Sequence, residues 1–416
     1  MLRGEHRARA FLLTYAQSSL GTGAAAVALF VIGYERRPSP WAITAVLLAY
    51  DLPPGILGPF VGALVDRVSR RWCVIAADLI RVAAFAGIAA VDSIEATVAF
   101  AFLAGAATAL YRPAALASLP SLVAPERLPA VTSLYGSLTD IGRTVGPALA
   151  AVGFAVFGSG GIMLINAATF AISAVVLSTL SFGDRVAGAP SAQPSFFKEV
   201  REGLQLATRG PLVRDVVIVS SGVILFASML NVAELPLAHK LGVGGSGFAL
   251  LLTAQGIGVV AGSLSGARGG GLRAYKAGYV TGAAAVGLGL IALSLAPWSA
   301  AAVVAFVVFG IGNGLQVENE RLIFQVAIPQ RLMGRAFALH DALGAWGFVT
   351  AYLIAGLTVS ELGARGAIGI AAGGTVAVLI YAVVALRRAP DPVIDDEPAP
   401  EQAVAGADDV AVEPVR

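Results

Sequence analysis

Twelve long apolar segments, separated by short polar loops, dominate this sequence and limit what it can fold into. They lie near residues 9–33, 41–65, 72–91, 95–118, 130–157, 160–182, 212–236, 246–267, 275–296, 299–322, 335–358 and 366–387. About 20 mostly apolar residues in a helix cross the hydrocarbon core of a bilayer. Only 13% of the residues are charged, whereas soluble domains carry roughly 25%. We therefore expect an all-α integral membrane protein with twelve transmembrane helices.

The distribution of basic residues predicts the orientation. With the N-terminus in the cytoplasm, 22 of the 28 Lys and Arg residues lie in cytoplasmic loops or at cytoplasmic helix ends. The exceptions are Arg36, Arg37, Lys240 and Arg365 in outer loops, and Arg81 and Arg143 within spans. This asymmetry follows the positive-inside rule, although the pair Arg36–Arg37, beside Glu35, goes against it. We expect a multi-pass protein of the cell membrane with both termini in the cytoplasm.

Short matches between the two parts of the chain predict an internal repeat. The stretch "PERL" at 125–128 recurs as "PQRL" at 329–332, and "LTD" at 138–140 corresponds to "LHD" at 339–341. "GPFVGALVD" at 58–66 aligns with "GVVAGSLSG" at 258–266. The matches keep their order at nearly one offset. Such repeats are typical of transporters that bind substrate between two related halves.

The repeat and the polar stretches predict four regions. Residues 1–182 and 212–388 form two six-helix halves. Residues 183–211 form a cytoplasmic linker, in which "SFFKEVREGLQLATRG" is predicted to be an amphipathic helix. Residues 389–416 are Pro-rich and acidic, a composition typical of a disordered tail.

The loop after the second span, "GALVDRVSRR", resembles a pattern of the major facilitator superfamily, with serine at position 69 where glycine is usual. The resemblance implies a conformational latch between the halves, made by Gly62, Asp66, Arg67, Arg70 and Arg71, with Arg112 as a candidate partner. The alternative is that these charges are ordinary cytoplasmic anchors. Asp66 distinguishes the two, because positive-inside anchoring explains the arginines but not the acid.

The fifth span carries "GRTVGPALAA", in which Gly142, Gly146 and Pro147 match an antiporter motif of that superfamily. The stretch "YRPAALASLPSLVAPERLPAVTSL" resembles its twelve-span efflux branch, which includes the enterobactin exporter and macrolide-efflux-like proteins. The resemblance covers Ala8 to Arg388 and implies export coupled to protons. Small residues four apart also simply allow close helix packing, which is the alternative interpretation of the glycines.

Ionisable residues within the spans are the candidates for proton coupling, because each is costly to place in lipid. Asp51 lies in the middle of the second span, just before Pro53 and Pro54. Asp140 and Arg143 in the fifth span are three residues apart, so they share a helix face and could form a salt bridge. His340 and Asp341 in the eleventh span are further candidates, since histidine titrates near neutral pH. Gln17, Tyr50, Asn231, Gln255 and Trp346 are candidates for lining the cavity.

These features predict a secondary transporter that exports a small, partly apolar molecule, such as a drug, antibiotic or siderophore, in exchange for protons. The alternatives are a metabolite importer or facilitator of the same fold, and a non-transporting protein of the flippase-like or sensor kind. No lysine follows the glycine pattern of an ATP-binding loop. We expect no enzymatic activity, cofactor, metal, ATP or nucleic acid. The usual form of the superfamily implies a monomer whose partners are the substrate, protons and the bilayer.

Overall fold

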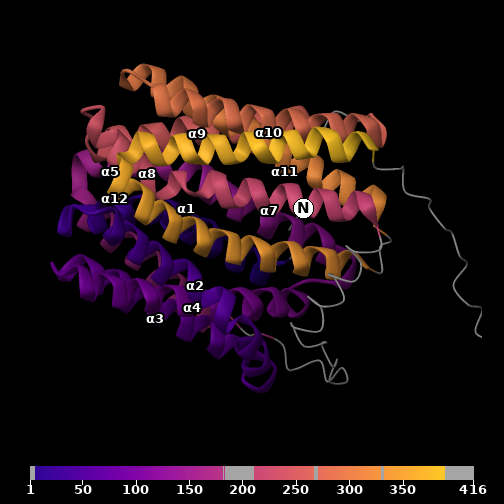
Figure 1. The fold of residues 1–416 in the computed structure, drawn as a ribbon. Helices are drawn as coiled ribbons and strands as arrows, with labels where there is room; N and C mark the ends of the chain where they lie inside the picture. The colour runs from indigo at the N-terminus through magenta and orange to yellow at the C-terminus, as the bar shows by residue number, and fades with distance from the viewer. Residues whose placement is uncertain (1–4, 181, 183–209, 267–269, 329–331, 389–416) are drawn as a thin grey trace, which may run out of the picture.

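In the computed structural model, the described residues are 5–180, 182, 210–266, 270–328 and 332–388, and they form helices and loops without any strand. The first set of helices is α1 (His6–Arg36), α2 (Pro40–Arg67), α3 (Arg70–Ala90), α4 (Ile94–Leu122), the short η1 (Pro125–Arg127) and α5 (Leu128–Thr179). The second set is α7 (Pro211–Ser228), α8 (Leu230–Lys240), α9 (Gly245–Gly266), α10 (Gly271–Leu295), α11 (Ser299–Ala327) and α12 (Met333–Arg388). The long helices lie side by side in one bundle (Figure 1).

Two helices, α5 and α12, are too long to cross a bilayer once. They contain 52 and 56 residues, and a straight helix of that length would measure about 80 Å against a hydrocarbon core of about 30 Å. Each is broken by one glycine, Gly158 at φ 66°, ψ −179° and Gly363 at φ 72°, ψ 172°. Only glycine adopts this backbone readily. Each helix therefore folds back on itself, as Figure 1 shows for α12.

Ten helical segments among the described residues are long and apolar enough to cross a membrane, with the parts of α5 and of α12 each counted together. Dividing these two at their glycines gives the expected number of spans, and the breaks fall between predicted spans. The all-helical membrane fold predicted from the sequence is therefore confirmed. The linker 183–209 and the tail 389–416 lie outside the described residues.

The two sets of helices repeat one packing pattern. In the first set, α1 packs on α5, α2 on α4, and α3 on both α4 and α5. In the second set, α7 packs on α12, α9 on α11, and α10 on both α11 and α12. The main contacts between the sets are α2 with α12 and α5 with α9. The polar groups of a substrate site must therefore come chiefly from the helices along these two seams.

Candidate functional site

One stripe of α2 faces α12 of the other set. Thr44, Asp51 and Gly55 are seven and four residues apart, which places them on one side of a helix. The Thr44 hydroxyl donates a hydrogen bond to the backbone oxygen of Tyr352 at 3.2 Å. A Cβ on Gly55 would lie 3.8 Å from the Ala345 Cβ. Asp51 is in the middle of this seam, yet its side chain is accessible to water.

Tyr352 connects three helices at the centre of the bundle. Its hydroxyl donates to Asp51 Oδ2 at 3.0 Å and accepts from Asn231 Nδ2 at 3.4 Å. Asn231 lies just after Met229, where α7 continues into α8 with helical backbone angles, and the two together make one apolar segment. The amide of Asn231 therefore lies within a membrane-spanning segment and supports the Tyr352 hydroxyl from there.

Glu234 on α8 is an acid that is not among the proton-coupling candidates predicted from the sequence. Its side chain is 3% exposed, it forms no ion pair or hydrogen bond with a described residue, and its charge acts on Tyr352. An enclosed carboxylate without a cation is costly unless it carries a proton. The signal was present in the sequence, as a single acid within "MLNVAELPLAH".

Asp140 and Arg143 of α5 face the space between the two sets. The exposed apolar side chains of Ile141, Val145 and Val152 mark the lipid side of the helix. At about 100° per residue, Arg143 lies opposite them and Asp140 about 60° from Arg143. Both are exposed, and no ion pair joins these two described side chains, so the expected salt bridge is not formed. The charge of Arg143 acts instead on Asp51.

The two sets close against each other at the end of the bundle where α1 ends and α2 begins, which we call the α1–α2 end. There Tyr34 stacks on His239 with ring centroids 4.8 Å apart, and Phe30 meets Phe248 at 6.2 Å. A Cβ on Gly356 would lie 2.7 Å from the Thr44 hydroxyl. Between described residues, every hydrogen bond and ring contact that joins the sets lies level with Asp51 or nearer this end.

The expected cavity residues differ in where they point. Asn231 and Gln255 face the central space. The Oε1 atom of Gln255 is buried without a hydrogen-bond partner among the described residues, and the exposed Ile257 and Leu264 lie on the other side of α9.

The structure gives the surroundings of the other three expected residues. Gln17 donates to the Thr169 backbone oxygen at 2.8 Å. Tyr50 packs closely on α4, where a Cβ on Gly105 would strike the Tyr50 backbone oxygen. Trp346 is 64% exposed on the same face of α12 as Leu353. Its position is rotated about 100° from that of Ala345, which faces Gly55 of α2.

The glycines of the fifth-span motif pack inside the first set and not along the seam between the sets. A Cβ on Gly142 would lie 2.5 Å from the Ser19 backbone oxygen, and one on Gly146 would strike the backbone of Gly23 in α1. Pro147 is buried. Other residues of α5 meet α9 of the second set: the Thr144 backbone oxygen lies 3.1 Å from a Cβ built on Gly256, and the Phe154 ring lies 3.7 Å from one built on Gly245.

The arginines of the loop pattern bind within their own set. Arg70 donates to the Ala117 backbone oxygen at 2.7 Å, and Arg71 donates to that of Ser178. Both acceptors are carbonyls near helix C-termini, where cations are favoured. Arg112 is exposed. Ser69 has φ −58°, so no glycine is required there. The side chains of Gly62, Asp66, Arg67 and Asp341 lie outside the described residues.

Two buried ionic clusters lie away from the centre. Asp78 and Arg81 form a local ion pair, with side chains almost wholly buried, and Arg81 lies over the rings of Tyr111 and Phe170. In the second set, His340 Nδ1 is 3.1 Å from Glu320 Oε1 and 3.2 Å from the Ser220 hydroxyl. Glu320 is 6% exposed and lies within α11, which extends to Ala327.

Curated relatives of this chain are transporters. A macrolide efflux protein A of Streptococcus pyogenes is 31% identical over 185 residues, which are 41% of this chain and 43% of that protein. Its namesake in Enterococcus faecalis is 33% identical over 181 residues, 40% of this chain and 53% of that protein. The chain thus matches about half the length of these relatives. An uncharacterized MFS-type transporter of Mycobacterium tuberculosis is 25% identical over 79% of both chains.

Solved structures share the fold at low sequence identity. The nucleoside transporter NupG aligns with a TM-score of 0.71 at 12% identity, over 92% of this chain and 99% of its own. The peptide transporter PepTSo aligns with a TM-score of 0.67 at 10% identity, over 92% and 97%. The family model described as Major Facilitator Superfamily matches residues 11–339. With this match and the helical membrane fold, the chain belongs to the Major Facilitator Superfamily.

Proposed function

We propose that this transporter exports a small, partly apolar molecule in exchange for protons. The observation that carries the proposal is Asp51, an exposed carboxylate in the middle of a span. It accepts a hydrogen bond from Tyr352 across the seam, and the charge of Arg143 acts on it. A carboxylate there can bind or release a proton as its surroundings change. Both its partners lie on helices that meet the other set.

The transport cycle we propose is alternating access, in which residues 1–182 rock against 212–388. We assign the α1–α2 end to the outside, following the basic residues, and the closed seam at this end then corresponds to a state open to the cytoplasm. Opening the α1–α2 end would break the bond between Asp51 and Tyr352. Asp51 would then exchange its proton with the outside, while Asp140, Arg143 and Gln255 contact the substrate.

The substrate class we propose rests on the macrolide efflux relatives and on the sparse polar lining. Few charged side chains face the centre, so an apolar molecule with a few polar groups suits it better than a sugar or an amino acid. The roles of His340 with Asp341 in proton transfer, and of Gly62, Asp66 and Arg67 in a latch, remain parts of this proposal.

The test uses everted membrane vesicles, a pH-sensitive dye and a macrolide as the probe. We expect addition of the macrolide to release protons from vesicles that carry the wild-type protein. Asp51→Asn should abolish this release, and Asp92→Asn, which removes an exposed carboxylate in the loop before α4, should leave it unchanged. Undiminished release with Asp51→Asn would refute the assignment of Asp51. Accumulation of the macrolide in intact cells would instead favour import.

A further inference from the structure

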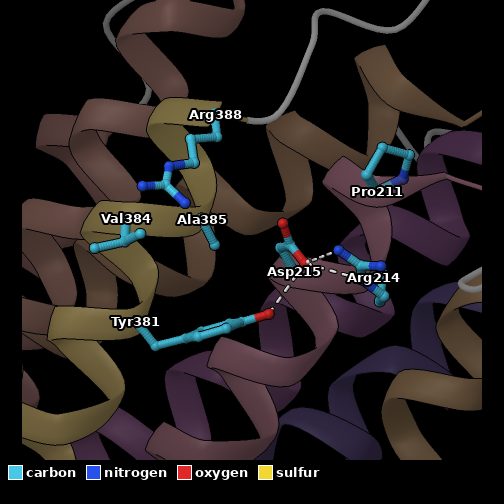
Figure 2. A pocket seen from close by; sticks show the side chains of 7 residues that line it. All are labelled: Pro211, Arg214, Asp215, Tyr381, Val384, Ala385 and Arg388. Carbon is cyan, nitrogen blue, oxygen red and sulfur yellow. Dashed lines mark hydrogen bonds and ion pairs between the residues drawn. The ribbon is translucent and has the colours of Figure 1, made fainter.

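A groove of about 290 Å³ lies between the start of α7 and the end of α12, away from the central site. Pro211, Arg214 and Asp215 border it from α7, and Tyr381, Val384 and Arg388 border it from α12 (Figure 2). The two helices belong to the same set, so the groove is not part of the seam that we assign to transport.

A charged network makes the floor of the groove. The Asp215 side chain is 4% exposed, and its Oδ1 accepts hydrogen bonds from Arg214 Nε at 3.0 Å and from the Tyr381 hydroxyl at 3.1 Å. Buried and bonded in this way, Asp215 holds Arg214 and Tyr381 in place and neutralises one guanidinium group. Arg214 remains half exposed, with a side-chain relative accessibility of 51%.

Arg388 supplies the charge that the network does not balance. It is exposed and forms no ion pair or hydrogen bond with a described residue. Two guanidinium groups and one carboxylate leave the lining with one net positive charge. Figure 2 shows Arg388 on α12 across the groove from Arg214 on α7.

The depth of the groove matches the boundary between headgroups and acyl chains. Arg214 is in the first turn of α7, and Arg388 is the last residue of α12, so both arginines are at the level where a span leaves the hydrocarbon. One turn deeper, the wall is apolar, with Val384 45% exposed and the neighbouring Ile380 61% exposed. A ligand that fits both levels has an anionic end and an apolar end.

We propose that this groove binds the headgroup of an anionic phospholipid, with the phosphate at Arg388 and Arg214 and the acyl chains against Val384. Basic pockets between helix ends bind such headgroups, and each arginine near the surface contributes a several-fold gain in affinity. A free inorganic phosphate shares the anionic chemistry but leaves the apolar wall uncovered.

The test is a titration of the purified full-length protein in detergent, followed by native mass spectrometry. Phosphatidylglycerol is the probe, and phosphatidylcholine is the zwitterionic comparison. We expect the wild type to bind phosphatidylglycerol more tightly than phosphatidylcholine. Arg388→Gln should lower the affinity for phosphatidylglycerol about five-fold. Arg387→Gln is the matched control, because Arg387 is an equally exposed neighbour that does not line the groove. It should change the affinity less than two-fold.

Three outcomes would overturn the proposal. Equal losses in the two variants would mean a diffuse effect of surface charge. Equal binding of the two lipids would mean that no headgroup charge is recognised. Displacement of the lipid by millimolar inorganic phosphate, but not by chloride at equal ionic strength, would assign the groove to a free anion. Because Arg388 is exposed and unbonded, its variant should melt at the wild-type temperature, so the comparison does not depend on refolding.

Discussion

The bond between Tyr352 and Asp51 should hold the α1–α2 end closed, and Tyr352→Phe tests this directly. The substitution removes a hydroxyl that donates to Asp51 at 3.0 Å and accepts from Asn231 at 3.4 Å. The ring remains to fill its place, since Tyr352 is 3% exposed. The bond to Asp51 spans the seam between α2 and α12, so it exists only while that seam is closed.

The size of the effect follows from the net value of such bonds. A hydrogen bond contributes about 0.5 to 1.5 kcal/mol between neutral groups and about 1.5 to 3 kcal/mol to a charged group. The 3.4 Å contact with Asn231 is within the second set and is present in both states. We therefore expect the bond between Tyr352 and Asp51 to stabilise the closed seam by about 1 to 2 kcal/mol. Its loss should shift the equilibrium between the two states about 5- to 30-fold toward the one open at the α1–α2 end.

The assay is the distance between two spin labels across the α1–α2 end. Arg37→Cys and Lys240→Cys place labels on exposed residues at the ends of α1 and α8, close to the contact of Tyr34 with His239. The chain has one cysteine, Cys73, which is buried and is replaced by serine. We expect Tyr352→Phe to raise the population with the longer distance.

Tyr381→Phe is the matched control for this experiment. It also removes a hydroxyl bonded to an aspartate, at 3.1 Å from Asp215, but this bond joins α7 and α12 of one set. It should leave the label distances unchanged. An unchanged distance distribution with Tyr352→Phe, or equal shifts in both variants, would refute the argument that the seam depends on this bond.

Three further predictions concern stability and can be measured as thermal unfolding of the purified protein. Gly142→Ala should destabilise it by about 1 to 3 kcal/mol, because the added Cβ would lie 2.5 Å from a backbone oxygen of α1, whereas Gly136→Ala, with nothing within 4 Å, should not lower the melting temperature. Gly158→Ala should cost about 1 to 3 kcal/mol, because φ is 66° at the turn of α5; an unchanged melting temperature would contradict that strain. Asp78→Asn should cost about 3 to 5 kcal/mol, because it leaves Arg81 buried without its partner.

Much of the fold could be predicted because membrane spans are specified locally. The length and hydropathy of each apolar run decide whether it crosses the bilayer, and "FGSGG" and "ELGARG" mark the turns at Gly158 and Gly363. The loop and fifth-span patterns also indicated the family correctly. These patterns can be recognised in the sequence without knowing which helices contact one another.

The partners of the polar side chains could not be predicted in the same way. Asp140 and Arg143 share a helix face as their spacing predicts, but no ion pair joins these two described side chains, and the charge of Arg143 acts on Asp51 of another helix. Asp51 bonds Tyr352, which lies 301 positions away. Trp346, chosen for its ring, points outward with Leu353.

The sequence by itself determined the number of spans, their turns and the acids that lie within them. The tertiary structure decided which face of each helix is turned to the centre, and so which of those acids meet a partner. The physical reason is that hydropathy is a property of a segment, whereas helix rotation is fixed by packing against neighbours. Gly142 of α5 meets Ser19 of α1 in this way, and such close packing fixes the rotation of α5.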